Sequence, residues 1–319
     1  MASQNKINLI KIKNHLQNKN FKIGGFLNFN SDASEKIFKL CKTANQSLLV
    51  LSFLNKPSDY QKYIKATDIL ISQNVNTPKI IDQSNLYKFV IMDYFPVSNA
   101  SKYFQKPQIK KILPLAVIAL TNLQKPKKKF SGVQVKSQNN LLKDALNGIE
   151  TFIDHYDHKI QIGFYLNKLV KVSLKKSTLK YRKFKPTLTH GDFFLDNLIY
   201  YNQKVDHQDT HYNHPLLDIS SLIFDARRSY STKVEDKLLK LYARRMKLNL
   251  KQLRSDIHMI SLLRNLRILG NWVQLYNAGK PKYLKVFRKN TWAQIFKHVE
   301  YLRLWDLREI FMEIYNKTS

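Results

Sequence analysis

The segment TLTHGDFFLDNLIYYNQKVDHQD, residues 187–209, decides the fold of this chain. Its apolar runs predict a strand, a polar loop, a second strand, a tight turn at residues 202–203 and a third strand. This pattern places Asp192, Asn197 and Asp206 at one end of a hairpin. Phosphoryl transfer needs such groups, because a carboxylate orients and deprotonates the attacking hydroxyl while hard oxygen ligands hold Mg²⁺. The segment therefore predicts a kinase-like catalytic loop.

The spacing of the polar residues agrees with this interpretation. His190 and Asp192 flank one glycine, Asn197 lies five residues after Asp192, and Asp206 follows the next strand. Kinases place a catalytic Asp, a metal-binding Asn and a second metal-binding Asp in this order. The alternative is that His190 and Asp192 only cap or hydrogen-bond a loop.

The first hundred residues alternate between strand-like and helix-like segments. Residues 48–54 and 87–92 predict buried strands, and residues 59–73 predict a helix between them. Helical patterns dominate the rest of the chain. This order predicts an α+β fold, with a small lobe over residues 1–95 and a larger helical lobe over residues 96–319.

Start signals and proline positions locate several helices in the second part. A helix is expected over residues 107–123, with a kink at Pro114, and helical periodicity resumes over residues 140–180. Residues 232–235 and 249–252 are each spaced as a capping box, which predicts two further helix starts.

Composition narrows the class of protein. The chain has 319 residues and a mass of 37.6 kDa, which is enough for two modest lobes. Cys41 is the only cysteine, so an intramolecular disulfide and a cysteine-based zinc site are both excluded. No segment approaches the roughly 20 apolar residues of a membrane span, and the N-terminus lacks the apolar stretch of a signal peptide. We expect a soluble protein of the cytoplasm, with the oligomeric state left open.

Positive charge dominates the composition. The chain has 54 Lys and Arg against 23 Asp and Glu, which gives a formal net charge of +31. A field of this sign attracts phosphorylated substrates, nucleic acid or anionic lipid. Lys, Asn and Ile are abundant together, however, and the lysines are spread along the whole chain, as compositional drift would produce. We favour drift with a generally anion-attracting surface over a dedicated nucleic-acid site.

His-Gly-Asp with an Asn five positions later resembles the aminoglycoside phosphotransferase and choline kinase superfamily, which has a bilobal protein-kinase-like fold. A narrower resemblance, to the kinases that phosphorylate N-acetylmuramate and N-acetylglucosamine at the anomeric hydroxyl, extends over most of the chain. The segments that carry it are SDASEKIFKL (31–40), QNVNTPKIID (73–82), HGDFFLDNLIYYNQKVDHQD (190–209), PLLDISSLIFDAR (215–227) and LLRNLRILGNWVQLYNAGKPKYL (262–284).

The resemblance implies an ATP- and Mg²⁺-dependent kinase that acts on a small molecule. By this similarity Asp192 is the catalytic base and His190 belongs to the same catalytic group. Asn197 and Asp206 hold Mg²⁺, and Asp218 braces the catalytic loop. Asp218 also stands at the head of an amphipathic segment, where an Asp often caps a helix.

The nucleotide-binding residues depart from the protein-kinase pattern. Protein kinases place a phosphate-pairing Lys on a central strand, yet the segment LLVLSFLNKP (48–57) carries none inside the strand. The glycine pair before the SDAS loop is a weak phosphate-loop signal, so a pseudokinase stays an alternative. The expected nucleotide contacts are Ser31, Asp32, Lys36 and Lys39 in and after that loop, and Met92 and Asp93 near a hinge.

The acceptor is expected to be a free amino sugar, on the strength of residues 262–284. Arg264, Asn265 and Arg267 lie on a helix there, and a guanidinium fork can bind a carboxylate bidentately. The alternative is that they are surface residues of an amphipathic helix. Rival acceptors are aminoglycosides and choline, but cationic substrates favour acidic sites, and this chain is poor in acids.

Overall fold

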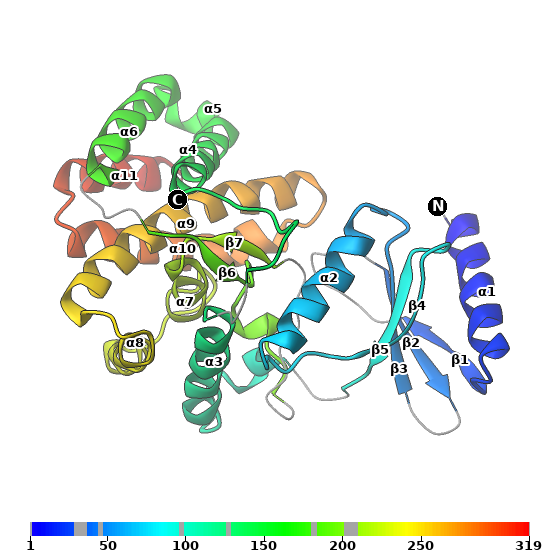
Figure 1. The fold of residues 1–319 in the computed structure, drawn as a ribbon. Helices are drawn as coiled ribbons and strands as arrows, with labels where there is room; N and C mark the ends of the chain where they lie inside the picture. Colours follow the sequence, from blue (N-terminus) through cyan, green and yellow to red (C-terminus); the bar gives the residue numbers. More distant parts are fainter. Residues whose placement is uncertain are drawn as a thin grey trace. The chain divides into compact units, whose positions relative to one another are not determined.

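The computed structural model describes residues 2–28, 37–43, 47–95, 99–125, 129–179, 184–200 and 210–318. The chain forms two compact units (Figure 1). The first combines Met1–Phe104 with Asp196–Asp209, and the second combines Gln105–Leu195 with Thr210–Ser319. Within the first unit the Ala100 amide donates to the Leu198 carbonyl. The lobe boundary expected at residue 95 stays a prediction.

The first unit is built on one antiparallel sheet with strand order β1-β2-β3-β5-β4. Its elements are α1 (Ala2–Asn18), β1 (Ile23–Asn28), β2 (Ile37–Thr43), β3 (Ser47–Ser52), α2 (Asp59–Ser72), β4 (Ile80–Ser84), β5 (Phe89–Asp93) and η1 (Ala100–Tyr103). The two predicted strands and the helix between them correspond to β3, β5 and α2. The helical conformation of α1 is not among the sequence predictions.

Helices α1 and α2 cover opposite faces of this sheet (Figure 1). Successive strand residues point to opposite faces, so Val50 joins the core under α1 with Ile12 and Leu16, whereas Leu51 joins the core under α2 with Tyr63. Both cores are apolar, which explains why the predicted strands have no polar alternation.

The second unit is mostly helical. Its elements are α3 (Ile109–Leu123), α4 (Gln138–His155), α5 (Asp157–Ile160), α6 (Gly163–Thr178), β6 (Thr187–Thr189), η2 (Leu195–Asn197, assigned to the first unit from Asp196 onward), β7 (His211–Asn213), α7 (Leu216–Ile223), α8 (Thr232–Met246), α9 (Leu250–Asn277), α10 (Lys282–Tyr301) and α11 (Trp305–Thr318). The long helix α9 packs against α4, α7, α8 and α10. The predicted helix over 107–123 corresponds to α3, which contains Pro114. Within the described ranges, no helix is both long and apolar enough to cross a membrane.

Two glycines allow α4 and α9 to cross at close range. A Cβ atom added to Gly270 of α9 would lie 2.6 Å from the Gly148 Cα atom of α4. The reverse substitution, at Gly148, would place a Cβ atom 2.5 Å from the Arg267 Cα atom and from the Leu266 carbonyl oxygen. These distances are below van der Waals contact, so only glycine fits on either side.

Three local expectations have different outcomes. Asn249 caps α9, since its side chain accepts from the Gln252 amide at 3.1 Å, as the sequence predicts. Helix α8 begins at Thr232, but the capping box expected to have Thr232 as its N-cap is wrong, because Ser231 is the N-cap residue. Strand β6 pairs with β7, beyond the segment expected to form the hairpin, and the turn expected at residues 202–203 lies outside the described residues.

A buried histidine pair joins α9 to α10. The Nδ1 atoms of His258 and His298 lie 2.9 Å apart, and the Tyr301 ring stacks on His258 at 3.7 Å between centroids. Burial lowers the pKa of His258 to about 3, with repulsion from Lys297 and Arg254 acting in the same direction. Burial also lowers the pKa of His298 well below its ordinary value.

These shifts predict a loss of stability in acid. The folded pKa of His258 is lower than the unfolded value of 6.5, so the unfolded state binds more protons as the pH falls below 6.5. At pH 5 the protonation of His258 in the unfolded state alone lowers the free energy of unfolding by about 2 kcal/mol. Urea unfolding at pH 7.5 and pH 5 measures this loss. His258→Gln should lose less stability than wild type between the two pH values, whereas the exposed-site control His158→Gln should match wild type; equal losses in all three proteins would contradict the assignment.

Candidate active site

The His-Gly-Asp segment forms a loop directly after β6. Gly191 adopts a φ of +90°, in the region that favours glycine, and so turns the chain. Phe193 and Leu195 are buried and anchor the loop in the apolar core. Asp192 lies between the turn and these anchors and is exposed. The loop therefore presents one carboxylate to solvent from a fixed backbone.

Asp218 of α7 holds the backbone of this loop by hydrogen bonds. Its carboxylate accepts hydrogen bonds from the backbone amides of His190, at 2.7 Å, and Gly191, at 3.0 Å. Asp218 is fully buried, and burial raises its pKa, although the two amides and His190 act in the opposite direction. Pro215 occupies the N-cap position of α7, so Asp218 contacts the loop and does not cap the helix.

His190 packs beneath the loop. Its ring is 1% exposed and meets the Phe193 ring edge-on at 5.6 Å between centroids. The hydroxyl of Thr189 donates to the His211 carbonyl at 2.7 Å and joins β6 to β7 at this point. A buried ring favours a role in supporting the loop, and the catalytic role expected for His190 stays a prediction.

The expected metal ligands are an amide and a carboxylate. Asn197 ends η2 and is half-buried, whereas Asp206 lies outside the described residues. Within the part of the chain that the structure describes, no group of three His, Cys, Asp or Glu residues could hold a metal ion. The expected donors are all oxygen atoms, which is the chemistry that Mg²⁺ prefers.

The expected nucleotide contacts are partly described. Ser31, Asp32 and Lys36 lie outside the described residues. Lys39 lies in β2, paired in register with Val50 of β3.

The two residues expected near a hinge end β5. The side chain of Met92 is buried under α2, where the Tyr63 hydroxyl donates to its sulfur at 3.5 Å. The Asp93 carboxylate accepts from the Lys79 amide at 3.4 Å. Met92 is also registered with Leu49 of β3 and Ile80 of β4, so the nucleotide contact expected of Met92 stays a prediction.

Two of the three expected acceptor residues are buried on α9. Arg264 is 4% exposed, which contradicts the surface alternative for this residue, and its Nε and Nη1 atoms have no hydrogen-bond partner among the described residues. Burial lowers its pKa to about 10; Asp225 and Asp192 act in the opposite direction, and Arg267 and Arg227 add to the decrease. The guanidinium of Arg264 therefore lies within electrostatic range of the exposed carboxylate of Asp192.

Asn265 and Arg267 differ in their access to solvent. Asn265 is fully buried, with neither amide atom bonded among the described residues, and its expected role at the acceptor stays a prediction. Arg267 is half-buried, and its Nε atom also lacks a partner there. Arg267 is therefore more accessible to solvent than Arg264, the other arginine expected at the acceptor.

A third cation, Arg227, lies among aromatic rings. Its guanidinium is 4.2 Å from the ring centroid of Phe194 in the His-Gly-Asp loop, 5.1 Å from that of Trp272 in α9 and 5.8 Å from that of Phe287 in α10. Asp225 fixes it from the other side, since one carboxylate oxygen accepts from both the backbone and the Nη1 of Arg227. Stacking on rings is a favoured environment for guanidinium.

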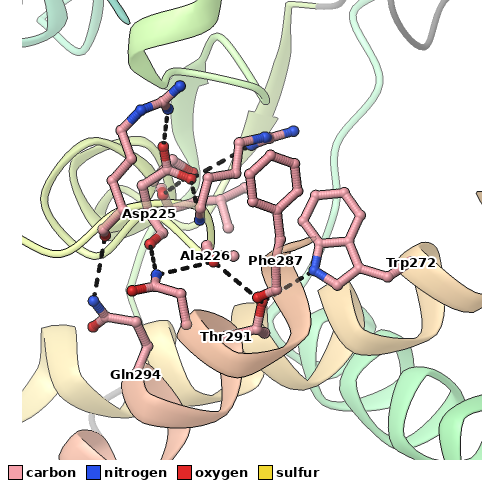
Figure 2. Close-up of polar contacts among 11 residues, drawn as sticks. Asp225, Ala226, Trp272, Phe287, Thr291 and Gln294 are labelled. Atoms are coloured by element: carbon pink, nitrogen blue, oxygen red, sulfur yellow. Dashed lines mark hydrogen bonds and ion pairs between the residues drawn. The ribbon is translucent and has the colours of Figure 1, made fainter. Parts of the chain in front are cut away.

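A chain of hydrogen bonds holds this cluster to α9 and α10 (Figure 2). The Trp272 indole donates to the Thr291 hydroxyl at 3.0 Å, and this hydroxyl can donate in turn to the Ala226 carbonyl at 3.2 Å. The Asn290 amide donates to the carbonyls of Asp225 and Ala226. The backbone before Arg227 is therefore held at several points.

Sequence reasoning did not single out Asp225 and Arg227. Both end the quoted segment PLLDISSLIFDAR, where the change from apolar residues to Asp-Ala-Arg is the one local signal. The aromatic partners of Arg227 come from the His-Gly-Asp loop, α9 and α10, so no sequence spacing connects them. The structure thus adds an arginine cluster, Arg227, Arg264 and Arg267, in the unit that carries Asp192.

Comparison with known proteins identifies the family. The model of the phosphotransferase enzyme family matches residues 28–253, which is more than half of the chain. The chain belongs to this family. The expected resemblance to the aminoglycoside phosphotransferase superfamily is thereby confirmed. The predicted enzyme class, a phosphotransferase, is confirmed by the same match.

Individual relatives agree with this assignment. An N-acetylmuramate/N-acetylglucosamine kinase of Caulobacter vibrioides is 34% identical over 104 residues, which are 30% of this chain and 29% of that relative. The match thus spans less than a third of the relative's length, and it agrees with the narrower resemblance only over that part of the chain.

Two solved structures share the fold of this chain. The ADP-bound aminoglycoside phosphotransferase APH(2'')-Ib is 16% identical and has a TM-score of 0.59, with 88% of this chain and 98% of that chain covered. Choline kinase LicA from Streptococcus pneumoniae is 14% identical with a TM-score of 0.58, over 89% of this chain and 98% of that chain. The predicted α+β, protein-kinase-like fold is confirmed.

Proposed function

We propose that this member of the phosphotransferase enzyme family transfers a phosphoryl group from ATP to a hydroxyl of a free amino sugar. N-acetylmuramate, which carries a carboxylate, is the first candidate and N-acetylglucosamine is the second. One observation carries the proposal: an exposed carboxylate, Asp192, on a loop that Asp218 holds by two backbone amides, within electrostatic range of the buried guanidinium of Arg264.

In this proposal Asp192 accepts the proton of the attacking hydroxyl and orients its oxygen toward the phosphoryl group. The hydrogen bonds from Asp218 keep the loop backbone in place and so limit the positions that the Asp192 carboxylate adopts. Asn197 and Asp206 would hold Mg²⁺, which supplies positive charge at the nucleotide phosphates when bound. Ser31, Asp32, Lys36 and Lys39 stay the proposed phosphate contacts, and Met92 and Asp93 the proposed contacts of the nucleotide base.

The arginine cluster supports an anionic acceptor. Arg264 and Arg267 lie three residues apart on α9 and so share a side of that helix, and both carry buried donor atoms without a partner among the described residues. Such donors gain most from an anionic partner, because an unsatisfied buried charge costs more than a bonded one. The lactyl carboxylate of N-acetylmuramate is one suitable partner.

Cationic acceptors fit this unit less well. A choline-type site holds its ammonium group against aromatic faces, but the described ring cluster of Phe194, Trp272 and Phe287 already holds the guanidinium of Arg227. A second cation there would meet repulsion instead of attraction. The same argument disfavours aminoglycosides, whose amino groups carry positive charge.

The proposed compartment is the cytoplasm. Cys41 is buried and free, and the chain has no second cysteine with which to pair. A reducing environment is compatible with this usage.

The acceptor assignment predicts a selective effect at Arg267. Turnover is measured for N-acetylmuramate and N-acetylglucosamine with ATP, with and without Mg²⁺, in wild type, Arg264→Ala and Arg267→Ala. Arg267→Ala is expected to raise KM for N-acetylmuramate roughly 10- to 100-fold, in line with the loss of a charge-assisted hydrogen bond, and to change KM for N-acetylglucosamine less than about threefold. Arg308→Ala on α11, where Arg308 pairs with Glu300, is the matched control.

The outcomes separate the parts of the proposal. If Arg264→Ala lost turnover with both sugars and Arg267→Ala did not, Arg264 would be assigned to the packing of α9. Arg267 would then remain the carboxylate contact. Unchanged kinetics with both sugars in both variants would exclude the arginine cluster as the acceptor site. No wild-type turnover of either sugar would exclude the substrate class.

A further inference from the structure

Helix α6 exposes an apolar surface that no described element covers. Phe164 is 87% exposed and Leu179, directly after the helix, is 84% exposed. Tyr165 and Val172 are also more than half exposed. Exposed large apolar side chains are ordinary when single, but these four lie along one side of one helix, as the geometry of 3.6 residues per turn shows.

Lysines share this side of α6. Lys168, Lys171, Lys175 and Lys176 are all exposed, and α6 contains no Asp or Glu. On the turns of the helix the lysines alternate with the apolar side chains, since Lys168 follows Phe164 and Lys175 precedes Leu179 by four residues each. The result is one face, named here the α6 face, that is both apolar and cationic.

The opposite side of α6 fixes the helix in place. Leu166, Val170 and Leu174 are buried on this side, and α6 packs against α4 and α11 (Figure 1). Asn167 of α6 donates to the carboxylate of Asp154 in α4 at 3.4 Å, and Asn167 is half-buried and lies outside the α6 face. The α6 face is therefore held outward by the core of the second unit.

The chemistry of the α6 face matches an anionic bilayer surface better than nucleic acid. A membrane interface takes up aromatic and aliphatic side chains, while lysines extend to the lipid headgroups and are attracted to anionic lipid. Nucleic acid offers no partner for Val172 and Leu179, and α6 has no Arg, the residue that binds phosphate bidentately. The net charge of +31 strengthens the attraction to the bilayer.

We propose that the α6 face is a docking surface for anionic lipid bilayers, which holds this enzyme at a membrane surface with Phe164 and Leu179 inserted at the headgroup level. This contact is peripheral, and it is independent of the proposed acceptor. In this contact the second unit has one orientation on the bilayer, with α6 toward the lipid.

Vesicle binding tests this proposal. Co-sedimentation of the full chain is measured with phosphatidylcholine vesicles and with vesicles that contain about 30% phosphatidylglycerol. Three variants are compared with wild type: Lys→Gln at 168, 171, 175 and 176; Phe164→Ala with Leu179→Ala; and a control with Lys→Gln at the exposed positions 110, 111, 233 and 237 of α3 and α8. The two lysine variants both lower the net charge from +31 by four, to +27.

We expect binding to the anionic vesicles alone. The α6 lysine variant should lose roughly 100-fold or more in the partition coefficient, and the apolar variant roughly 10-fold, while the control changes less than about threefold. Equal losses in the two lysine variants, or no loss in the apolar variant, would show general charge attraction and overturn the proposal. Binding of an RNA or DNA oligonucleotide without vesicle binding, lost in the α6 variant, would assign the face to nucleic acid instead. Thermal midpoints and kinase turnover without vesicles should match wild type in every variant.

Discussion

Asp192→Asn is expected to lower kcat by at least about 100-fold, the lower range for the loss of a positioned general base. The amide keeps the size of the carboxylate but cannot accept the proton of the attacking hydroxyl. Asp192 is exposed, and the loop around it is held by Phe193, Leu195 and Asp218, so the fold and the nucleotide affinity should change little. Steady-state kinetics on a confirmed acceptor and calorimetric titration of ATP with Mg²⁺ measure the two effects.

Asp306→Asn provides the control for this substitution. Asp306 is an exposed acid in the first turn of α11, so the same chemical change there should leave turnover within about twofold. A thermal midpoint equal to that of wild type would show that Asp192→Asn is folded. Near-normal turnover in a folded Asp192→Asn would exclude Asp192 as the base and leave it a loop residue.

The parts of the site that follow one another in the chain were predictable. The interval from His190 to Asn197 indicated a catalytic loop, and the structure places Asp192 on a loop held by a turn at Gly191. Short apolar runs likewise located β3 and β5, and the pattern of residues 59–73 located α2, because these signals lie within one local stretch of sequence.

The parts that depend on tertiary contacts were not predictable. The environment of Arg227 is made by Phe194, Trp272 and Phe287, which come from three separate elements. Residues on one helix also differed: Arg264 and Asn265 are buried, and Arg267 is half-buried. Helical position alone cannot separate these cases, because burial depends on which neighbours cover each side.

Glycines in helices show the same limit. A glycine inside a helix costs about 1 kcal/mol of helix stability relative to Ala, and this applies to both Gly148 and Gly270. No sequence pattern links these two positions, which lie more than a hundred residues apart. The structure provides the reason for both, because α4 and α9 approach there to backbone contact. A pair of small residues that face each other is a contact signal only after the two helices are known to cross.

Gly270→Ala should therefore destabilise the protein, although alanine is the better helix former. The new Cβ atom would lie 2.6 Å from the Gly148 Cα atom and 2.7 Å from its carbonyl oxygen, both of which are backbone atoms. The helices must separate to relieve this overlap, and the lost packing along α4 and α9 should cost about 3 kcal/mol or more, against a gain of about 1 kcal/mol in helix propensity. Urea unfolding followed by the fluorescence of Trp272, Trp292 and Trp305 reports on this unit. Gln274→Ala, at an exposed position of α9, is the control and should change stability by less than about 0.5 kcal/mol. A Gly270→Ala protein as stable as this control would mean that the helices can separate at little cost, and the close crossing would then not determine the stability of the unit.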